Sequence, residues 1–311
     1  MSELFCFGLG YSAMELATLL KDQGFSVSGT VRQSGKAKTL SQQNINAISI
    51  DEFGVSDVGI LQRQHPQDGE REFRPDIVQA IARATHLLVS IAPNELGDPV
   101  LNNYKQLLVD TQNIKWIGYL STVGVYGNHD GAWVDEETTP KPLSTRSKYR
   151  VQAENEWLQI GRETGKPVQL FRLAGIYGPG RNPLDKLRQG RARRIDKPCQ
   201  VFNRIHVRDI ARALIQSIEQ PRSGAVYNVT DDEPAPPQDV IAYAADLLNM
   251  PPPPLISFED SDLSPLGRSF YGENKRVSNA RMKGELNFRL KFPTYREGLA
   301  ALADEDRVSC E

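Results

Sequence analysis

Two glycines near the start of the chain have the spacing of a phosphate-binding turn. Gly8 and Gly10 follow an apolar run at residues 4–7, and Ala13 comes three residues after the second glycine. In a G-x-G-x-x-A turn the first glycine allows a tight bend and the second lets a pyrophosphate approach the backbone. The small third residue lets a helix pack closely on a strand. The pattern therefore indicates dinucleotide binding, and a turn that serves only packing is the alternative.

The anion would lie at the start of the helix that follows this turn. Leu16 and Leu20 give the segment a helical apolar face, and Tyr11 and Ser12 open it. The N–H groups of a first helical turn lack partners within the helix, and together with the helix dipole they favour a phosphate. We therefore predict that Tyr11, Ser12 and the two glycines bind the cofactor.

The next strand distinguishes between two cofactors. It ends at Thr30 and Arg32, and Lys36 and Lys38 follow. A unit that binds NAD usually has Asp or Glu about 20 residues after the glycines, where it holds the ribose 2′-hydroxyl. No acid occupies that place here, whereas an arginine can hold a 2′-phosphate with two hydrogen bonds. We predict that Thr30 and Arg32 bind the cofactor and that NADP is preferred over NAD, the alternative being a solvated basic loop.

Strand and helix patterns alternate through the first two-thirds of the chain. This order is typical of an α/β protein whose parallel sheet carries helices on both faces. The expected strands cover residues 4–7, 25–32, 47–50, 86–93, 115–120 and 168–173. Right-handed crossovers bring their ends to one edge, where such sheets bind ligands. We predict a Rossmann-type doubly wound parallel sheet.

Further cofactor residues are predicted where strands end at this edge. Asp51 ends the third strand, where it would either bind the adenine amino group or cap the next turn. Ala92 and Pro93 end the fourth strand, at a turn. We predict that all three contact the cofactor.

Composition excludes several classes of protein. The net charge of −2 gives no sign of nucleic-acid binding, and no apolar run is long enough to span a bilayer. The four histidines lack metal-ligand spacing. Three scattered cysteines without a CxxC motif are typical of reduced thiols in the cytoplasm. We expect a cytoplasmic protein that binds small molecules and no metal.

Proline and glycine become frequent after residue 176, which indicates a change of organisation. We predict that residues 1–176 form the Rossmann domain and that about 203–230 return to it. Residues 177–202 and 231–311 would form a smaller C-terminal substrate-binding domain, in which Ser278 caps a helix that runs through Leu286.

Three later segments carry longer motifs. They read Ser-Thr-x-x-Val-Tyr-Gly at 121–127, Arg-Leu-Ala-Gly-Ile-Tyr-Gly-Pro-Gly at 172–180 and Arg-Ile-His-Val-Arg-Asp-Ile-Ala at 204–211. Together they resemble the extended short-chain dehydrogenase/reductases, and among these the NAD(P)-dependent epimerases and dehydratases. The resemblance spans nearly the whole chain and implies the two domains. It also implies a homodimer, in which helices at 99–109 and 145–164 form a four-helix interface.

The resemblance implies positions for catalysis as well. Thr122, four residues before the tyrosine of Val-Tyr-Gly, matches the family's catalytic Ser or Thr, and Ser121 precedes it. The family then carries a Tyr-x-x-x-Lys pair, in which the tyrosine transfers a proton and the lysine lowers its pKa. In this sequence Arg146 and Arg150 occupy the positions of that pair. Glu154 occupies the position of the acidic residue that the family often carries after the lysine.

An alternative register ends at Lys148 and puts Ser144 at the tyrosine position, so neither register supplies a tyrosine. Arginine is always protonated, and Arg146 therefore cannot exchange protons but can bind an anion. Tyr149 lies on another face of the same helix. The leading hypothesis is an NADP-dependent oxidoreductase or epimerase acting on a small or nucleotide-sugar-like substrate. The alternative is a non-catalytic NADP-binding sensor or regulatory protein.

A literal Tyr-x-x-x-Lys does occur, at Tyr271 and Lys275. Gly272 and Asn274 interrupt any helical pattern there, and the next helix is expected only near Ser278. We predict that this pair is not the catalytic one, the alternative being that Tyr271 or Lys275 touches the substrate.

Overall fold

The computed structural model describes residues 2–50, 62–64 and 71–308, with side chains at 2–50 and 74–307. Internal contacts divide the chain into two compact units. Unit 1 comprises Met1–Ser121, Thr145–Phe171 and Leu214–Val226, and unit 2 comprises Thr122–Ser144, Arg172–Ala213 and Tyr227–Glu311. The domain boundaries predicted from the sequence stay predictions.

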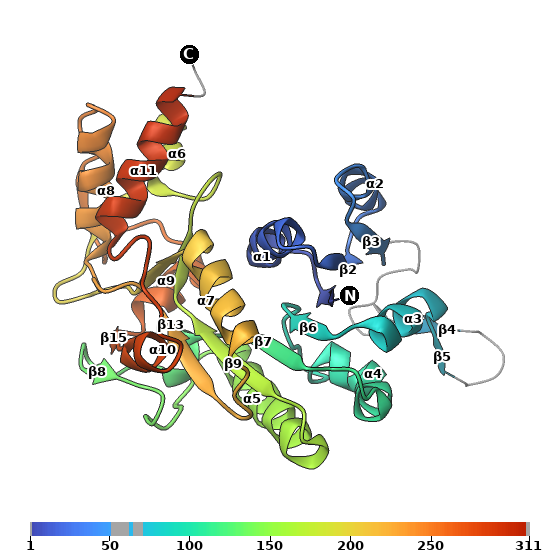
Figure 1. Ribbon diagram of the computed structural model, residues 1–311. Helices are drawn as coiled ribbons and strands as arrows, with labels where there is room; N and C mark the ends of the chain where they lie inside the picture. The colour runs from blue at the N-terminus through green and yellow to red at the C-terminus, as the bar shows by residue number, and fades with distance from the viewer. Residues whose placement is uncertain (1, 51–61, 65–70, 309–311) are drawn as a thin grey trace. The chain divides into compact units, whose positions relative to one another are not determined.

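A seven-stranded sheet has the order β13-β9-β7-β6-β1-β2-β3 (Figure 1). Its strands are β1 (Glu3–Phe7), β2 (Ser26–Val31), β3 (Asn46–Ser49), β6 (His86–Val89), β7 (Trp116–Thr122), β9 (Val168–Leu173) and β13 (Val226–Val229). The pairings from β3 through β7 are parallel. The chain adds strands first on one side of β1 and then on the other, so the order reverses between β1 and β6. The predicted doubly wound sheet is confirmed, and such a reversal is where these sheets bind ligands.

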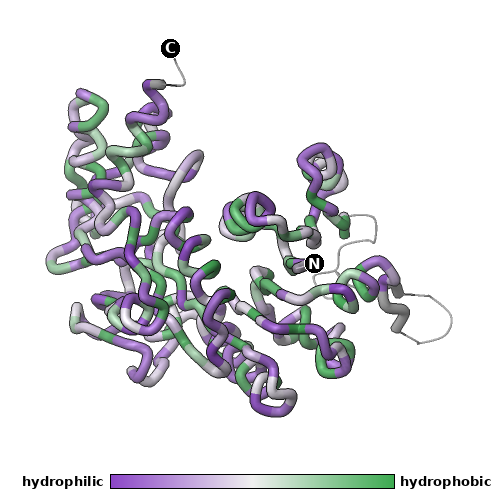
Figure 2. Tube along the Cα trace, viewed as in Figure 1, coloured by the Kyte–Doolittle hydropathy of each residue, from purple (hydrophilic) through white to green (hydrophobic). Residues whose placement is uncertain are grey.

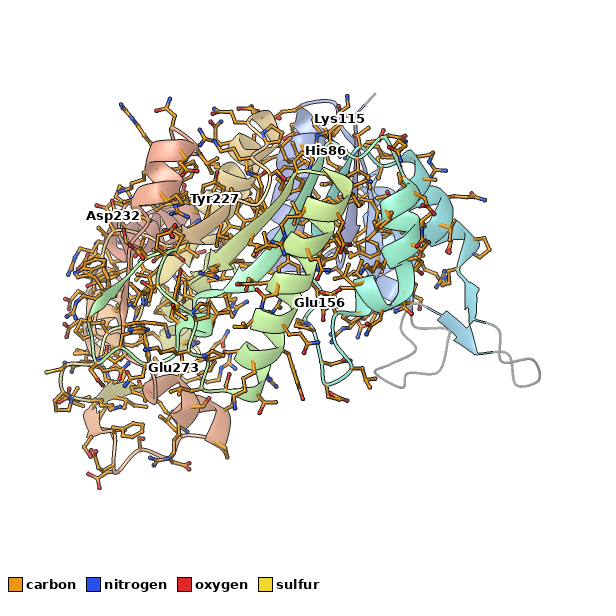
Figure 3. The ribbon with its side chains drawn as sticks, turned by 90° about the horizontal axis from the view of Figure 1, so that it is seen from below. His86, Lys115, Glu156, Tyr227, Asp232 and Glu273 are labelled. Carbon is orange, nitrogen blue, oxygen red and sulfur yellow. The ribbon has the colours of Figure 1, made fainter. Side chains whose placement is uncertain are left out.

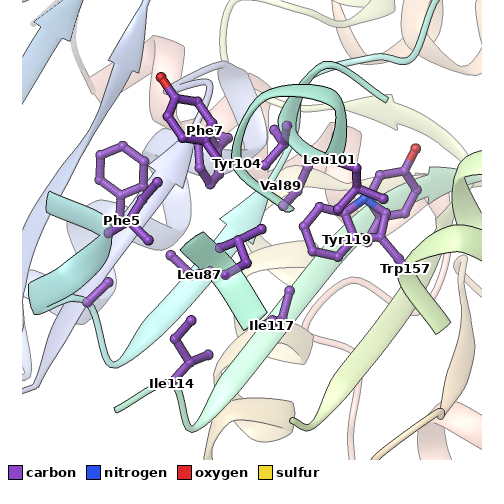
Figure 4. Packing of buried hydrophobic residues seen from close by; sticks show 14 of the residues in the cluster. Phe5, Phe7, Leu87, Val89, Leu101, Tyr104, Ile114, Ile117, Tyr119 and Trp157 are labelled. Atoms are coloured by element: carbon purple, nitrogen blue, oxygen red, sulfur yellow. The ribbon is translucent and has the colours of Figure 1, made fainter. Parts of the chain in front are cut away.

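One face of the sheet in unit 1 is covered by α3 (Pro75–Arg83), α4 (Pro99–Asp110) and α5 (Thr145–Thr164). Figure 4 shows Phe7 and Tyr119 from the strands packing with Tyr104 and Trp157 from the helices, all fully buried. The ring centroids of Tyr119 and Trp157 are 6.1 Å apart. The Trp157 indole N–H donates to the carboxylate of Asp98 (3.1 Å), which caps α4. This contact ties α5 to the start of α4.

The other face carries α1 (Tyr11–Asp22) and α2 (Ser34–Gln42) (Figure 1). The buried face of α1 includes Ala13, Leu16 and Leu20, as expected from their spacing. On α2 only Leu40 is buried, and hydrophilic residues predominate there (Figure 2). The basic residues of α2 therefore remain near solvent.

A histidine with a structural role lies where the strands of the sheet begin, away from the predicted ligand-binding edge. His86 begins β6, and Figure 3 shows it near Lys115, just before β7. Burial and the Lys115 ammonium lower the pKa of His86 to about 4, so its ring stays neutral.

Among the described residues no group of His, Cys, Asp or Glu could hold a metal, and no helix is long and apolar enough to cross a bilayer.

Unit 2 is built from short elements around an apolar cluster of its own. Its helices and 3₁₀ turn are η1 (Val123–Tyr126), α6 (Pro183–Arg188), α8 (Pro237–Leu247), α9 (Pro265–Tyr271), α10 (Ala280–Glu285) and α11 (Tyr295–Val308). Paired short strands are β8 (Trp133–Val134) with β15 (Arg276–Val277), β10 (Gly175–Tyr177) with β12 (Arg204–His206), and β11 (Arg194–Asp196) with β14 (Leu255–Ser257). The helix α7 (Val207–Glu219) begins in this unit.

One local prediction needs correction, and the structure adds elements that the sequence analysis did not predict. The helix expected from Ser278 to Leu286 is α10, whose N-cap is Asn279, although the Ser278 hydroxyl accepts the N–H of Ala280 (3.3 Å). The helix α9, which the sequence analysis did not predict, ends at Tyr271. The strands β4 (Gln62–Gln64) and β5 (Arg71–Phe73), also not predicted, form an antiparallel pair.

Candidate cofactor and active site

The turn between β1 and α1 is held by side chains from two neighbouring strands. Gly8 has a φ of +92°, a conformation that favours glycine. Its N–H donates to the Thr30 hydroxyl (2.9 Å), and its C=O accepts from the Ser90 hydroxyl (2.6 Å). A Cβ at Gly8 would lie 3.0 Å from the Ser90 oxygen, so a side chain fits poorly there.

Gly10 differs from Gly8 because the space beside it is open. No heavy atom lies within 4 Å of the place where its Cβ would project. Gly10 is also the N-cap of α1, and no side-chain hydrogen bond caps the helix. The first turn of α1 thus presents backbone N–H groups to an open approach, as a phosphate requires.

Positive charge surrounds this turn. Arg32 follows β2, is exposed, and makes no hydrogen bond or ion pair with any residue that the structure describes. Lys36 of α2 donates from Nζ to the C=O of Leu9 (2.6 Å), which holds an ammonium against the turn. Lys38 is exposed on the same helix. The arrangement suits a ligand that carries phosphates.

The remaining predicted cofactor residues have mixed exposure. Ser12 and Pro93 are buried, Tyr11 is half-buried and Ala92 is exposed after β6. Asp51 lies outside the described residues. Their contacts with a cofactor stay predictions.

Arg150 of α5 lies against the end of β7. One guanidinium nitrogen, Nη1, donates to the C=O of Leu120 (2.6 Å) and to the hydroxyl of Tyr119 (3.1 Å). The guanidinium also lies 5.5 Å from the Tyr119 ring centroid. Burial raises the pKa of Tyr119, so this phenol stays protonated. Arg150 is therefore a fixed cation at the strand end.

The two hydroxyls at the end of β7 are both engaged. Ser121 donates to the buried carboxylate of Glu154, one turn beyond Arg150 on α5 (2.5 Å). Thr122, the first residue of unit 2, accepts the N–H of Gly124 (3.1 Å) and so caps η1. Ser121, Arg150 and Glu154 thus meet within unit 1, and the catalytic roles assigned to Thr122, Ser121, Arg146 and Arg150 stay predictions.

The tyrosine of the Val-Tyr-Gly motif is buried and hydrogen-bonded on both sides of its hydroxyl. Tyr126 is buried in unit 2, where its hydroxyl donates to the amide oxygen of Asn228 (2.8 Å). The same hydroxyl accepts from Arg172 (3.0 Å), whose guanidinium lies 5.0 Å from the ring centroid. These contacts fix the turn that follows Thr122.

The Tyr271 and Lys275 pair is also built into unit 2. Lys275 is 6% exposed, and its ammonium donates to the C=O of Gly127 (2.8 Å) and to Glu273 (2.6 Å). Burial lowers the pKa of Lys275. Tyr271 stacks on Phe258 with ring centroids 5.1 Å apart, and because α9 ends at Tyr271 the two residues share no helix face.

Sequence reasoning missed two members of the turn. Ser90 immediately follows β6, and a hydroxyl at a strand end of the predicted edge was a usable signal. No signal in the sequence indicated the bond from Lys36 to the Leu9 backbone, because a lysine on an exposed helix is usually a solvated side chain.

Comparison with known proteins identifies relatives of the whole chain. The chain is 45% identical to a conserved protein of unknown function from Silicibacter pomeroyi, with a TM-score of 0.83 over 98% of this chain and 99% of that one. Protein YeeZ of Escherichia coli K12 is 28% identical over 94% of this chain and 97% of its own length. The structure of MoeE5 with UDP-glucose and NAD is 20% identical over the full length of both chains, with a TM-score of 0.71, and shares the fold.

A family model of the NAD-dependent epimerases and dehydratases matches residues 8–230. The matched span begins at the first glycine of the turn and includes all three of the longer motifs. The chain therefore belongs to the NAD-dependent epimerase/dehydratase family.

Proposed function

We propose that this protein is an NADP-dependent oxidoreductase or epimerase of the cytoplasm that acts on a small or nucleotide-sugar-like substrate. The open turn at Gly10 supports a dinucleotide, and it is the observation that carries the proposal. Arg32, which is exposed at the end of β2 and pairs with no described residue, supports NADP over NAD, because a guanidinium can bind a 2′-phosphate with two charge-assisted hydrogen bonds.

Changing Arg32→Ala should weaken NADP binding and leave NAD binding unchanged. A charge-assisted contact is worth about 1.5–3 kcal/mol, so the dissociation constant for NADP should rise about tenfold or more. Calorimetric titration of both cofactors measures this, with Lys38→Ala as the control that removes an exposed cation from α2. Tighter binding of NAD than NADP by the wild type, or an equal loss for both cofactors in Arg32→Ala, would contradict the preference.

A second candidate is a non-catalytic NADP-binding sensor or regulatory protein. It is favoured by Arg146 and Arg150 at the positions where the family carries its proton-transferring tyrosine and its lysine. Neither guanidinium can exchange a proton near neutral pH. NADPH consumption with a panel of carbonyl and nucleotide-sugar compounds distinguishes the two candidates, since turnover of any compound excludes the second.

We further propose a homodimer that forms through α4 and α5. The basis is the family resemblance, and both helices present side chains away from the core, among them Glu156 of α5 (Figure 3). Leu107 and Leu158 pack against the core and leave part of their apolar side chains exposed on the two helices. Multi-angle light scattering should return the mass of two chains, and the mass of one chain would reject this interface.

A further inference from the structure

Two arginines one turn apart on α5 carry charge that no described carboxylate pairs with. Arg146 is exposed and makes no hydrogen bond or ion pair with a described residue. Arg150 is half-buried, and its hydrogen bonds to described groups go to a backbone carbonyl and a phenol, which are both neutral. At a spacing of four residues the two guanidinium groups share one helix face.

The buried acids nearby do not remove this charge. Asp98 accepts from the N–H groups of Val100 and Leu101 and from the Trp157 indole. Burial raises the pKa of Asp98, and the Arg150 guanidinium opposes this shift without reaching ion-pair distance. Glu154 accepts from Ser121. Neither carboxylate forms an ion pair with Arg150 in the described structure. Half-burying the Arg150 guanidinium with no carboxylate at ion-pair distance among the described residues is unfavourable, and an anion that binds there would offset this cost.

The arginine pair stands at the sheet edge that carries the glycine turn. Arg150 bonds to Leu120 near the end of β7, and only β6 separates β7 from β1, which Gly8 follows. With strands about 4.8 Å apart, the two strand ends are about 10 Å from each other. Arg146 lies one helical turn, about 5.4 Å, from Arg150. A molecule of moderate size can therefore reach both the arginines and a cofactor on the turn.

We propose that Arg146 and Arg150 form a substrate-binding site for a carboxylate or phosphate group, and that the substrate of this protein is anionic. The assignment of the bound group as part of a substrate rests on the proposed function. A guanidinium presents a planar set of N–H donors that matches either anion, and its charge does not vary with pH. Arg150 keeps its position through Leu120 and Tyr119, while the exposed Arg146 is available to close on the ligand.

The test titrates the NADPH-loaded protein with inorganic phosphate and, separately, with acetate, using calorimetry. Arg146→Ala removes the proposed ligand, and Arg162→Ala is the matched control because it removes an exposed arginine from the last turn of the same helix. For the anion that binds better, the dissociation constant should rise about tenfold or more in Arg146→Ala and stay unchanged in Arg162→Ala. Comparison of the phosphate titration with the acetate titration shows which of the two anions the site prefers.

Two results would overturn the proposal: no saturable binding of either anion to the wild type, or the same loss in both variants. Because free phosphate could also occupy the glycine turn of any molecules that lack NADPH, the titration is repeated without NADPH in Gly10→Val, whose turn is closed. Anion binding that depends on Arg146 should persist in that background. If the wild type fails to bind NADPH while Arg146-dependent anion binding remains, the proposed cofactor function fails and the anion site stands.

Discussion

Gly10→Val should abolish the binding of NADP and of NAD while the protein stays folded. The new side chain would project into space that is open in the free protein, where the pyrophosphate must approach the backbone. Each charge-assisted hydrogen bond to the pyrophosphate contributes about 1.5–3 kcal/mol. Loss of two such bonds weakens binding about 100-fold or more. Titration monitored by NADPH fluorescence measures the affinity, and thermal unfolding monitors the fold.

Gly284→Val is the matched control for this change. Gly284 lies within α10 of unit 2, and no atom lies within 4 Å of its Cβ position. The control should keep both cofactor affinity and stability, because glycine is a poorer helix former than valine. Unchanged affinity in Gly10→Val would refute the pyrophosphate assignment.

Lys275→Met should destabilise the protein strongly without changing its affinity for the cofactor. The Lys275 and Glu273 side chains are 7% and 16% exposed, so methionine would leave a largely buried carboxylate and the Gly127 carbonyl without their donor. Removing one partner of a buried pair costs about 3–5 kcal/mol. Urea unfolding measures this loss. The control Lys283→Met breaks an ion pair with Asp232 whose side chains are each 37% exposed, and it should cost less than about 1 kcal/mol.

Turnover and cofactor binding in a second variant, Tyr271→Phe, test whether the literal Tyr-x-x-x-Lys pair is catalytic. Tyr271→Phe keeps the ring that stacks on Phe258, so it should leave the fold, cofactor binding and any turnover intact. We expect Arg146→Ala to impair turnover more. If Tyr271→Phe alone eliminates turnover while NADP still binds, Tyr271 is the acid and the assignment to the first turns of α5 is wrong.

The sheet and the glycine turn could be predicted because their signals are local. Buried parallel strands read as short apolar runs, and a left-handed residue such as Gly8 has a side-chain requirement that the sequence shows directly. The missed helix α9 also had a local signal. Ser264 caps it and Pro265 opens it, which is a regular start for a helix.

The contacts of Arg150 and Lys275 could not be predicted in the same way. Arg150 bonds to a strand residue 30 positions earlier, and Lys275 bonds to Gly127, 148 positions earlier. Hydrogen bonds between residues so far apart in the sequence depend on how the elements pack, and neither periodicity nor a motif predicts them. The same holds for Tyr126, whose motif indicated a family but not its bonds to Arg172 and Asn228.

The bonds that hold Gly8 have a consequence for the thermodynamics of binding. Thr30 and Ser90 engage the N–H and C=O of this residue, and Lys36 engages the carbonyl of Leu9, so the bonds that hold the loop come from the protein itself. The conformational entropy of this short loop is therefore lost when the chain folds. A cofactor meets a surface that is already ordered, so its affinity is not reduced by the cost of arranging the loop.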